Sequence, residues 1–304
     1  MPISIYAGIK AGCIDAFYID GRVRSQLIER NPKSEEVIKP LVRGRDITAW
    51  NTNTQDIYLI GTLPALKINI DDYPAIKDHL LGFTIERLEQ TGKEYIVNGE
   101  KIKARKKTCN KWFETQDQVK YYAELKKPKI IFPNITSVFP FTYDENGVYP
   151  NDNNFFIVEK ENAIANEAEC HPERTLEPKA IGEVKGSLLK ALLAIFNSSL
   201  CKFWIWHNCP VLNGGTRKLQ IAYFENLRIP LDNVELLQQL AALADEIIAA
   251  KRSLSQSKGT EHVIASDSEA IQRNIADLEK QVNTLVYQLY GVSDAEEIEA
   301  VEKR

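Results

Sequence analysis

The second half of the chain carries two series of apolar residues at helical spacing. Between Leu236 and Ile247, leucine and isoleucine are separated by four, three and four residues, and a longer series from Ile271 to Leu289 follows the same alternation. This spacing places apolar side chains along one face of a helix and is typical of a coiled-coil seam. The polar, serine-rich segment 253–268 suits a connecting loop. The pattern predicts an antiparallel pair of helices.

Further segments carry helical signals. Residues 186–208 are largely apolar with a break at Asn197-Ser198-Ser199, which predicts two core helices. Residues 72–90 predict one helix that ends before a glycine, and residues 22–32 predict a short helix that ends near a proline. Ser34, followed by acidic residues, predicts a helix N-cap.

Strand signals lie mainly in the first half of the chain. Residues 13–20 alternate between apolar and polar, and residues 56–62 form a short apolar run. Residues 127–158 are rich in Ile, Phe, Val and Tyr, and predict several antiparallel strands. Within them, Asn146-Gly147 between apolar flanks predicts a hairpin turn. The Arg-Gly-Arg-Asp sequence at 43–46 predicts another turn.

These elements predict an α+β (mixed α/β) fold. It combines a small mixed or antiparallel sheet and flanking helices with a C-terminal antiparallel helical pair. A chain of 304 residues can bury one large core or two ordinary ones. The pattern changes near Pro230, so the predicted domains are residues 1–230 and a helical tail, residues 231–304.

Charge is distributed unevenly along the chain. The net charge of −4 argues at first against a nucleic-acid partner. Residues 231–304, however, hold fourteen acidic and seven basic side chains, which leaves residues 1–230 with a net charge of +3. Within residues 99–130, ten cations face four acids. This local excess is typical of a surface that binds a polyanion.

The cysteines favour a reducing compartment. Five cysteines at irregular spacing do not make a disulfide framework. A metal site built from Cys201, His207 and Cys209, with help from Cys170 and His171, is an alternative to buried thiols, but no tight cysteine pair supports it. No secretory or membrane-spanning segment is recognisable. We therefore expect a cytoplasmic protein with no metal and no membrane partner.

No catalytic motif is recognisable in the chain. Phosphate-binding glycine loops, nucleophile elbows, zinc-protease helices and a nuclease arrangement are absent from the sequence, and its four histidines are scattered. An independent enzyme, such as a nuclease or a deaminase, remains an alternative because carboxylates can pair in space without a sequence signature. We predict no catalytic residues in this chain.

A basic run at residues 101–113 favours nucleic-acid binding. It carries six cations in eleven residues beside Trp112 and Phe113. Such charge attracts phosphates and positions a protein on a duplex without specifying sequence. A solvated surface loop anchored by the two aromatic residues explains the same run equally well.

Two glycine-centred turns add candidates. Arg43 and Arg45 flank Gly44, and each guanidinium suits a phosphate or the O6/N7 edge of guanine, with an ion pair to Asp46 as the alternative. In residues 213–218, two adjacent glycines let backbone amides approach an anion, and an arginine and a lysine add charge. A tight turn alone also explains the glycine pair.

Six blocks occur in order along the chain: GIKAGCIDAFYID, VIKPLVRGRDI, KPKIIFPNI, LLAIFNSSLCKFWI, GGTRKLQIAYFENLRIP and LVYQLYGVSDAEEIEAVE. Together they resemble the TaqI-like C-terminal specificity domain. This domain is the target-recognition part of adenine-specific DNA methyltransferases and of fused type II restriction-modification enzymes. The resemblance covers nearly the whole chain and depends on the order of the blocks, since each block alone is weak.

The resemblance implies a division of labour. This chain would contact double-stranded DNA, while a separate methyltransferase domain or subunit would bind S-adenosylmethionine and methylate a flipped adenine. A nuclease domain would cut DNA if the parent enzyme does so. The family's Asn-Pro-Pro-Phe/Tyr motif and glycine-rich cofactor motif are absent, and Phe-Pro-Asn-Ile at 132–135 does not replace them. We therefore expect no cofactor in this chain, and we expect the chain to be part of a longer protein.

The leading hypothesis is a DNA target-recognition domain without catalysis of its own, whose helical tail docks on the recognition or methyltransferase domain. It requires the cations to gather on one concave side of the fold. The competing hypothesis is a helical scaffold or specificity subunit that assembles with a methyltransferase subunit. The predicted DNA contacts are Arg43, Arg45, Lys101, Lys103, Arg105, Lys106, Lys107, Lys111, Trp112, Asn213, Gly214, Gly215, Thr216, Arg217 and Lys218.

Overall fold

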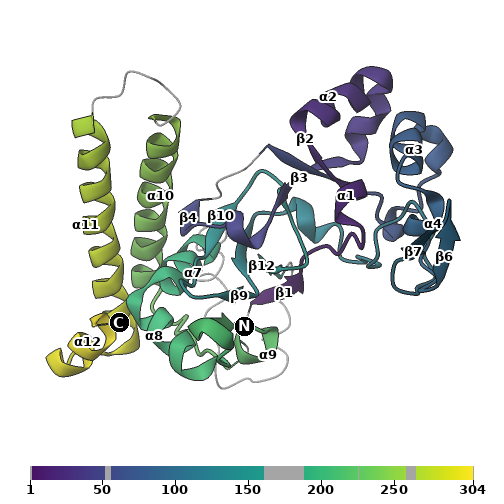
Figure 1. The fold of residues 1–304 in the computed structure, drawn as a ribbon. Helices are drawn as coiled ribbons and strands as arrows, with labels where there is room; N and C mark the ends of the chain where they lie inside the picture. Colours follow the sequence, from purple (N-terminus) through teal and green to yellow (C-terminus); the bar gives the residue numbers. More distant parts are fainter. Residues whose placement is uncertain (1, 52–55, 161–187, 225, 258–264, 304) are drawn as a thin grey trace, which may run out of the picture.

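A five-stranded sheet lies between two lobes of the protein (Figure 1). The computed structural model describes residues 2–51, 56–160, 188–224, 226–257 and 265–303. All neighbouring strands of this sheet are antiparallel except β10 and β4, which are parallel. The strand order is β1 (Ile3–Ala7), β12 (Asn154–Glu159), β8 (Lys129–Pro133), β10 (Thr142–Asp144) and β4 (Trp50–Asn51).

The central strands of this sheet separate two hydrophobic clusters. In β8, Ile130 and Phe132 belong to one cluster, whereas Ile131 belongs to the other. Neighbouring Phe156 and Ile157 in β12 are divided in the same way. Successive side chains of a strand point to opposite faces. Both faces of the sheet are therefore covered, which explains why these strands are apolar without interruption.

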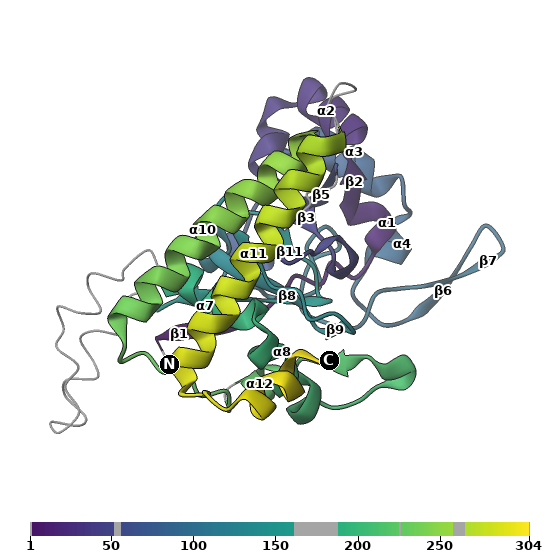
Figure 2. The ribbon, with the colours of Figure 1, turned by 90° about the vertical axis from the view of Figure 1, so that its left-hand side faces the viewer.

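The N-terminal lobe packs on one face of the sheet. Its own four-stranded sheet has the order β11 (Tyr149–Pro150), β3 (Ile38–Val42), β5 (Ile57–Ile60) and β2 (Tyr18–Asp20). Its helices are α1 (Ile14–Phe17), α2 (Gly21–Arg30), α3 (Pro74–Leu81) and α4 (Ile85–Leu88). Short 3-10 turns are η1 (Pro32–Glu36), η2 (Gly44–Asp46), η3 (Pro64–Leu66), η4 (Ile70–Asp72) and η5 (Glu124–Lys126). A two-stranded ribbon, β6 (Glu94–Val97) and β7 (Glu100–Lys103), extends away from this lobe (Figure 2).

Helices cover the opposite face of the sheet. In α7 (Leu188–Asn197) every residue except Lys190 is buried. The long helices α10 (Val234–Ser257) and α11 (Ala265–Tyr290) lie side by side, and α10 also packs on α7 and β4 (Figures 1 and 2). The remaining elements are α8 (Ser199–Asn208), η6 (Asn213–Gly215), α9 (Ile221–Phe224), α12 (Ala295–Glu302), and a second ribbon of β9 (Ile135–Thr136) with β13 (Arg217–Lys218).

The fold class predicted from the sequence is confirmed: the protein is mixed α and β, with small mixed and antiparallel sheets and a C-terminal helical pair. The break predicted at 197–199 is also confirmed. Ser198 caps α8, because its Oγ accepts a hydrogen bond from the Cys201 amide at 3.2 Å. Most of the predicted loop between the long helices, residues 258–264, lies outside the described residues.

Two helix and strand assignments are wrong near the N-terminus. Residues 13–20 form α1 followed by β2, because a helical turn buries both Ala16 and Phe17, which strict alternation cannot do. The single helix predicted over 72–90 is divided into α3 and α4. Thr84 lies between them with φ of 68°, a left-handed conformation that no α-helix continues through.

Two turn assignments also need correction. Ser34 is buried inside η1, a 3-10 turn that begins at Pro32, and does not cap an α-helix. The turn at Asn146-Gly147 does not close a hairpin, because the strands it joins, β10 and β11, belong to different sheets. The carboxylate of Asp144 organises this turn by accepting amide hydrogen bonds from Asn146 at 3.1 Å and Val148 at 2.9 Å.

The helices on both sides of residue 230 share one hydrophobic cluster. Leu240 and Ile247 of α10 join Leu192 of α7 and Phe132 of β8 in it. The proposed boundary near Pro230 stays a prediction. No single helix in the described ranges is long and apolar enough to cross a bilayer, and α7 and α8 reach such a composition only together, across a 67° bend.

Candidate nucleic-acid interface

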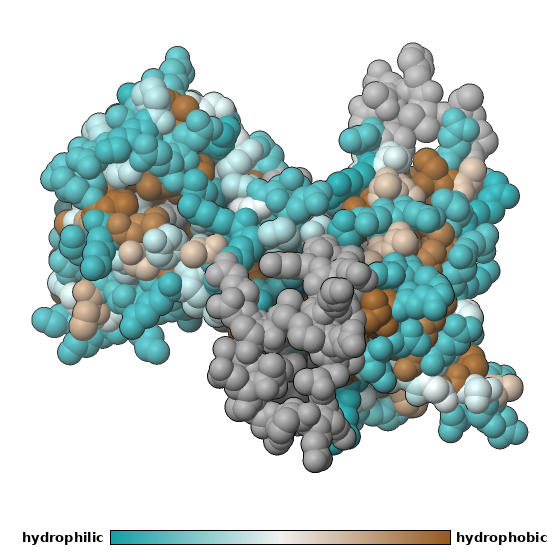
Figure 3. Space-filling view, turned by 180° about the vertical axis from the view of Figure 1, so that it is seen from behind, coloured by the Kyte–Doolittle hydropathy of each residue, from teal (hydrophilic) through white to brown (hydrophobic). Residues whose placement is uncertain are grey.

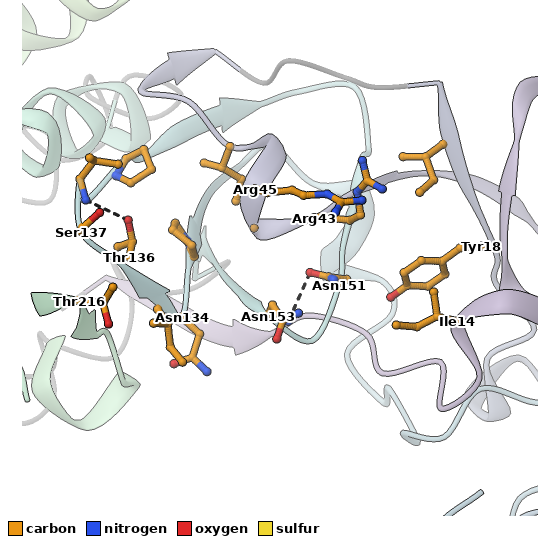
Figure 4. Close-up of a pocket in the computed structure, with 17 residues that line it drawn as sticks. Ile14, Tyr18, Arg43, Arg45, Asn134, Thr136, Ser137, Asn151, Asn153 and Thr216 are labelled. Atoms are coloured by element: carbon orange, nitrogen blue, oxygen red, sulfur yellow. Dashed lines mark hydrogen bonds between the residues drawn. The ribbon is translucent and has the colours of Figure 1, made fainter. Parts of the chain in front are cut away.

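A cleft of about 740 Å³ brings together segments that are far apart in the sequence (Figure 4). The η2 turn supplies Arg43 and Arg45, and the loop after β8 supplies Asn134. The turn between β11 and β12 contributes Asn153, and the residue before β13 contributes Thr216. Two of the predicted binding segments, the Arg-Gly-Arg-Asp turn and residues 213–218, therefore meet at this cleft.

The two arginines of the η2 turn have different environments. Asp46, which is 8% exposed, accepts hydrogen bonds from Arg43 Nε at 2.7 Å and from a second guanidinium nitrogen at 3.0 Å. These bonds raise the pKa of Arg43 above its usual value. Arg45 is exposed, and none of the ion pairs among the described residues includes it. The ion-pair alternative thus holds for Arg43, while the guanidinium of Arg45 faces solvent.

Asparagine side chains hold the cleft wall in place. Asn154 donates through Nδ2 to the Val42 carbonyl at 3.2 Å and to Asn151 Oδ1 at 2.7 Å. The backbone N–H of Asn134 donates to the backbone carbonyl of Asn153 at 2.8 Å. Gly44 packs closely here, because a Cβ at this position would lie 3.3 Å from Asn154 Oδ1, a tight contact. The η2 turn, β3 and the β11–β12 turn are therefore fixed to one another.

Two polar atoms at the cleft wall have no protein partner. Asn154 Oδ1 and Asn134 Oδ1 are both buried without a hydrogen bond to any described residue. Asn153, in contrast, is exposed beside Asn134 on the cleft wall (Figure 4). At the far end, burial and the nearby Asp152 carboxylate raise the pKa of Tyr18 to about 12, so this phenol stays neutral and can donate a hydrogen bond.

Residues 213–218 form a projecting tip that is anchored at its base. The Leu212 amide donates to the Thr216 carbonyl at 2.9 Å, and β13 pairs with β9. Gly214 and Gly215 both have φ of 77°, and a Cβ on either would meet no atom. Backbone strain, and not close packing, thus favours glycine at both positions. Asn213 is exposed with them at this tip.

Arg217, a predicted DNA contact, is an interior residue. It is 6% exposed, its Nε donates to the Trp206 carbonyl at 3.0 Å, and its guanidinium carbon lies 4.0 Å from the centre of the Trp206 ring. The side chain therefore attaches β13 to α8 by a hydrogen bond and a cation–π contact. Lys218 is half-buried beside it.

Arg105 is likewise an interior residue. Its guanidinium donates to the carbonyls of Leu88 at 2.8 Å, Ala11 at 2.9 Å, Glu114 at 2.8 Å and Trp112 at 2.6 Å. Burial lowers the pKa of Arg105 to about 10. Arg105, a predicted DNA contact, therefore joins three backbone segments of the N-terminal lobe, at residues 11, 88 and 112–114.

The other cations of the basic run are exposed. Lys101 pairs with Glu94 at 2.6 Å on the β6–β7 ribbon, where Lys103 also lies. Lys106, Lys107 and Lys111 are exposed beyond this ribbon. Trp112 is partly buried and packs edge-on against Phe113, as the anchoring alternative proposed. Beyond this run, Lys126 lines a different hollow, between β3 and the β10–β11 turn, and Lys129 is fully buried.

A charge cluster links the basic run to the cleft. Burial raises the pKa of Asp117, while Lys10 and Lys106 act in the opposite direction because they lie close to this carboxylate. Asp152, which acts on Asp117, also acts on Tyr18 at the end of the cleft. Lys10 is exposed and was missed in the sequence, where an isolated lysine in Gly-Ile-Lys-Ala-Gly carries no binding signal.

The thiols offer no metal site in the part of the chain that the structure describes. There, no group of three histidine, cysteine or carboxylate side chains comes together as ligands would. Cys201 and Cys209 are free and buried, and burial raises their pKa values to about 12 and about 11. Cys170 and His171 lie outside the described residues.

Comparisons with known proteins give sequence relatives and a structural neighbour. The chain is 28% identical to the type II methyltransferase M.XhoI of Xanthomonas vasicola over 302 residues, which cover 97% of this chain and 42% of that protein. It is 24% identical to the type II methyltransferase M.BstVI of Geobacillus stearothermophilus over 244 residues, 80% of this chain and 36% of that protein. No protein-family model matches the chain.

The fold resembles part of a much larger solved structure. A structure of the type IIL restriction-modification enzyme MmeI in complex with DNA aligns with a TM-score of 0.57 and 12% identity, over 97% of this chain and 33% of that one. This chain thus spans less than half the length of the proteins it matches. The similarities support a relationship to restriction-modification methyltransferases, while the narrower TaqI-like assignment stays a prediction.

Proposed function

We propose that this chain binds double-stranded DNA as the target-recognition part of a type II restriction-modification methyltransferase. The observation that carries the proposal is the cleft, where the exposed Arg45, amide side chains and the tip before β13 meet on a rigid frame. The same fold occurs in MmeI, whose structure contains DNA. Cations and amides on a concave surface suit phosphates and base edges.

Chemistry is assigned to the rest of the enzyme. Under this proposal a methyltransferase domain or subunit binds S-adenosylmethionine and methylates an adenine, and any nuclease activity belongs to a further domain. An adenine has to leave the helical stack before it is methylated, which requires the duplex to be held on both sides of it. The cleft described above would hold one of these sides. This chain alone would bind DNA without modifying it.

We leave three of the predicted residues out of the proposed contacts. Arg105 and Arg217 are left out, because both are buried and bonded to backbone carbonyls. Trp112 is left out because it packs on the core. Lys10 is added because it is exposed and lies, like Lys106, close to the Asp117 carboxylate. The proposed set is Lys10, Arg43, Arg45, Lys101, Lys103, Lys106, Lys107, Lys111, Asn213, Gly214, Gly215, Thr216 and Lys218.

Binding to a labelled duplex at several salt concentrations tests the proposal. A plot of the logarithm of the binding constant against the logarithm of the salt concentration is a straight line. Each lysine that contacts a phosphate makes its slope steeper by about one unit. Lys106→Ala and Lys107→Ala are each expected to weaken binding and to lower the slope by about that amount. Lys280→Ala on α11, an exposed lysine far from the cleft in sequence, is the control. The proposal fails if the full chain binds no duplex, or if all three variants lose affinity equally.

One observation favours the competing function, assembly through the helical pair. Hydrophobic residues remain visible on the rear surface of α10 and α11 (Figure 3), and Leu236, Leu243 and Leu285 are only partly buried. Such a surface suits a protein partner. Glutamate substitutions at the exposed Ala242 and Ala249 of α10 are expected to block assembly with a methyltransferase subunit under this alternative. Unchanged assembly in both variants argues against it.

A further inference from the structure

Three aliphatic side chains are exposed inside the cleft. Ile14 is 63% exposed, Ile135 is 51% exposed and Val138 is 70% exposed, and all three line the cleft. Ile135 and Val138 come from β9 and the loop after it, whereas Ile14 of α1 lies beside Tyr18 at the far end of the cleft (Figure 4). Leaving aliphatic side chains exposed to water costs free energy. Several exposed aliphatic side chains in one cleft are therefore typical of a binding surface.

The loop that carries Val138 is held in place. Thr136 Oγ1 accepts a hydrogen bond from the Val138 amide at 3.1 Å, and β9 is paired with β13 on the preceding side. On the following side, the ring of Phe139 is buried at φ of 47°. Burial of this ring holds the loop, so the exposed position of Val138 belongs to the folded structure and not to a loose segment.

The chemistry of the cleft matches the major groove of DNA. That groove displays the thymine methyl group and the O6 and N7 acceptors of guanine, whereas the minor groove displays neither. Arg45 offers a solvent-facing guanidinium for the acceptors, beside Arg43, which Asp46 holds. The β9–β13 ribbon is a two-stranded element of the kind that fits the width of the major groove.

We propose that the cleft reads base edges in the major groove, with Arg45 contacting a guanine and Val138, supported by Ile135, contacting a thymine methyl group. The inference rests on the proposed function and adds to it a division between base and phosphate contacts. The exposed lysines at 106, 107 and 111 lie outside the cleft lining and contact phosphates in this arrangement. Specificity and general affinity then come from separate groups.

Selection of bound duplexes from a random-sequence pool by the full chain tests the Arg45 contact. The wild-type chain is expected to enrich a motif that contains a guanine, and Arg45→Ala is expected to lose the preference at that base pair alone, by roughly 5- to 150-fold. Lys106→Ala should keep the whole motif and bind every sequence more weakly. Retention of the full motif by Arg45→Ala overturns the inference. A wild-type chain that enriches no motif overturns the proposed function itself.

Removal of one methyl group tests the Val138 contact. In the selected motif each thymine is replaced in turn by deoxyuridine, which lacks only the C5 methyl group. At one position the wild-type chain is expected to lose affinity about fourfold, the value of one buried methyl group, and Val138→Ala should show no loss there. Ile96→Ala is the matched control, because Ile96 is 81% exposed on the β6–β7 ribbon and does not line the cleft.

The outcomes also separate other uses of this apolar group. Side chains that wedge between base pairs kink the duplex and do not depend on a single methyl group. Equal deoxyuridine effects in wild type and Val138→Ala overturn the methyl contact. Loss of binding in Val138→Ala on every sequence, with a bend in wild-type complexes seen by fluorescence energy transfer, would show a wedge in its place.

Discussion

Arg105 and Lys106 are adjacent cations whose environments are opposite. The guanidinium of Arg105 is bonded to four backbone carbonyls inside the N-terminal lobe, and the ammonium group of Lys106 is at the surface. Both residues belong to the same basic run, and nothing in the sequence distinguishes one from the other as a DNA contact. What separates them is the direction of the side chain, which the packing of Ala11, Leu88 and Trp112 around Arg105 determines.

Arg105→Ala is expected to destabilise the protein by roughly 3 kcal/mol or more, because it leaves buried carbonyls without a donor. Lys106→Ala is expected to change stability by less than about 0.5 kcal/mol, as is usual for exposed positions. Urea unfolding of both variants measures the difference. A loss of DNA binding by Arg105→Ala without any loss of stability would contradict the structural role assigned to this residue.

His79 is expected to make stability depend on pH. Its Nε2 donates to the Ala16 carbonyl at 3.1 Å, and burial lowers the pKa of His79 below its usual value despite this hydrogen bond. The unfolded chain therefore takes up a proton more readily than the folded protein. Stability should fall as the pH drops below about 6.5. His79→Gln should lose this component, measured by urea unfolding between about pH 5 and 7, and His207→Gln, at an exposed position, should keep it.

At the scale of single elements, local sequence signals explain most helices. Ser198 ends the apolar run of α7 and caps α8, and the alternation of apolar residues from Leu236 and from Ile271 corresponds to α10 and α11. The failures occur where long-range packing overrides local pattern. Thr84 divides a predicted helix, and the Asn146-Gly147 turn sends the chain into another sheet.

Ser198→Ala is expected to cost about 1–2 kcal/mol of stability. The Ser198 hydroxyl accepts a hydrogen bond from the Cys201 amide and donates one to the Ile195 carbonyl at 2.6 Å. Ser198 is only 1% exposed, so water cannot replace these partners. Ser253→Ala, at an exposed position of α10, is the control and should change stability little. The change in thermal unfolding midpoint measures both. Equal midpoints for the two variants would show that the cap does not contribute.

At the scale of the whole molecule, one sheet joins the two lobes. Its β8 and β12 strands contribute to both hydrophobic clusters, and α10 completes the cluster on one face. Trp50 of β4 reinforces this connection, because its Nε1 donates to Glu279 of α11 at 2.8 Å. The helical pair is therefore packed as part of the body, so its removal affects more than an attachment surface.

Deletion of residues 231–304 is expected to prevent cooperative folding of residues 1–230. It would expose the face of α7 that Leu237, Leu240 and Ile247 cover. A milder version of the test is Leu240→Ala, which should cost roughly 2–5 kcal/mol, against Gln239→Ala at an exposed position of the same helix. Circular dichroism during heating measures both. A sharp unfolding transition of the shortened chain would instead support an independent domain that ends near residue 230.

The sequence by itself determined the class of the fold, the helical pair and the central strands, because apolar periodicity is a local property that burial on one or two faces imposes on each element. It also indicated the Arg-Gly-Arg-Asp turn and the segment 213–218, which meet at the cleft. Only the tertiary structure decided that Arg105, Arg217 and Lys129 are interior while Arg45 faces solvent. The direction of a charged side chain depends on which distant carbonyls or carboxylates lie within reach, and no count of charges along a segment contains that information.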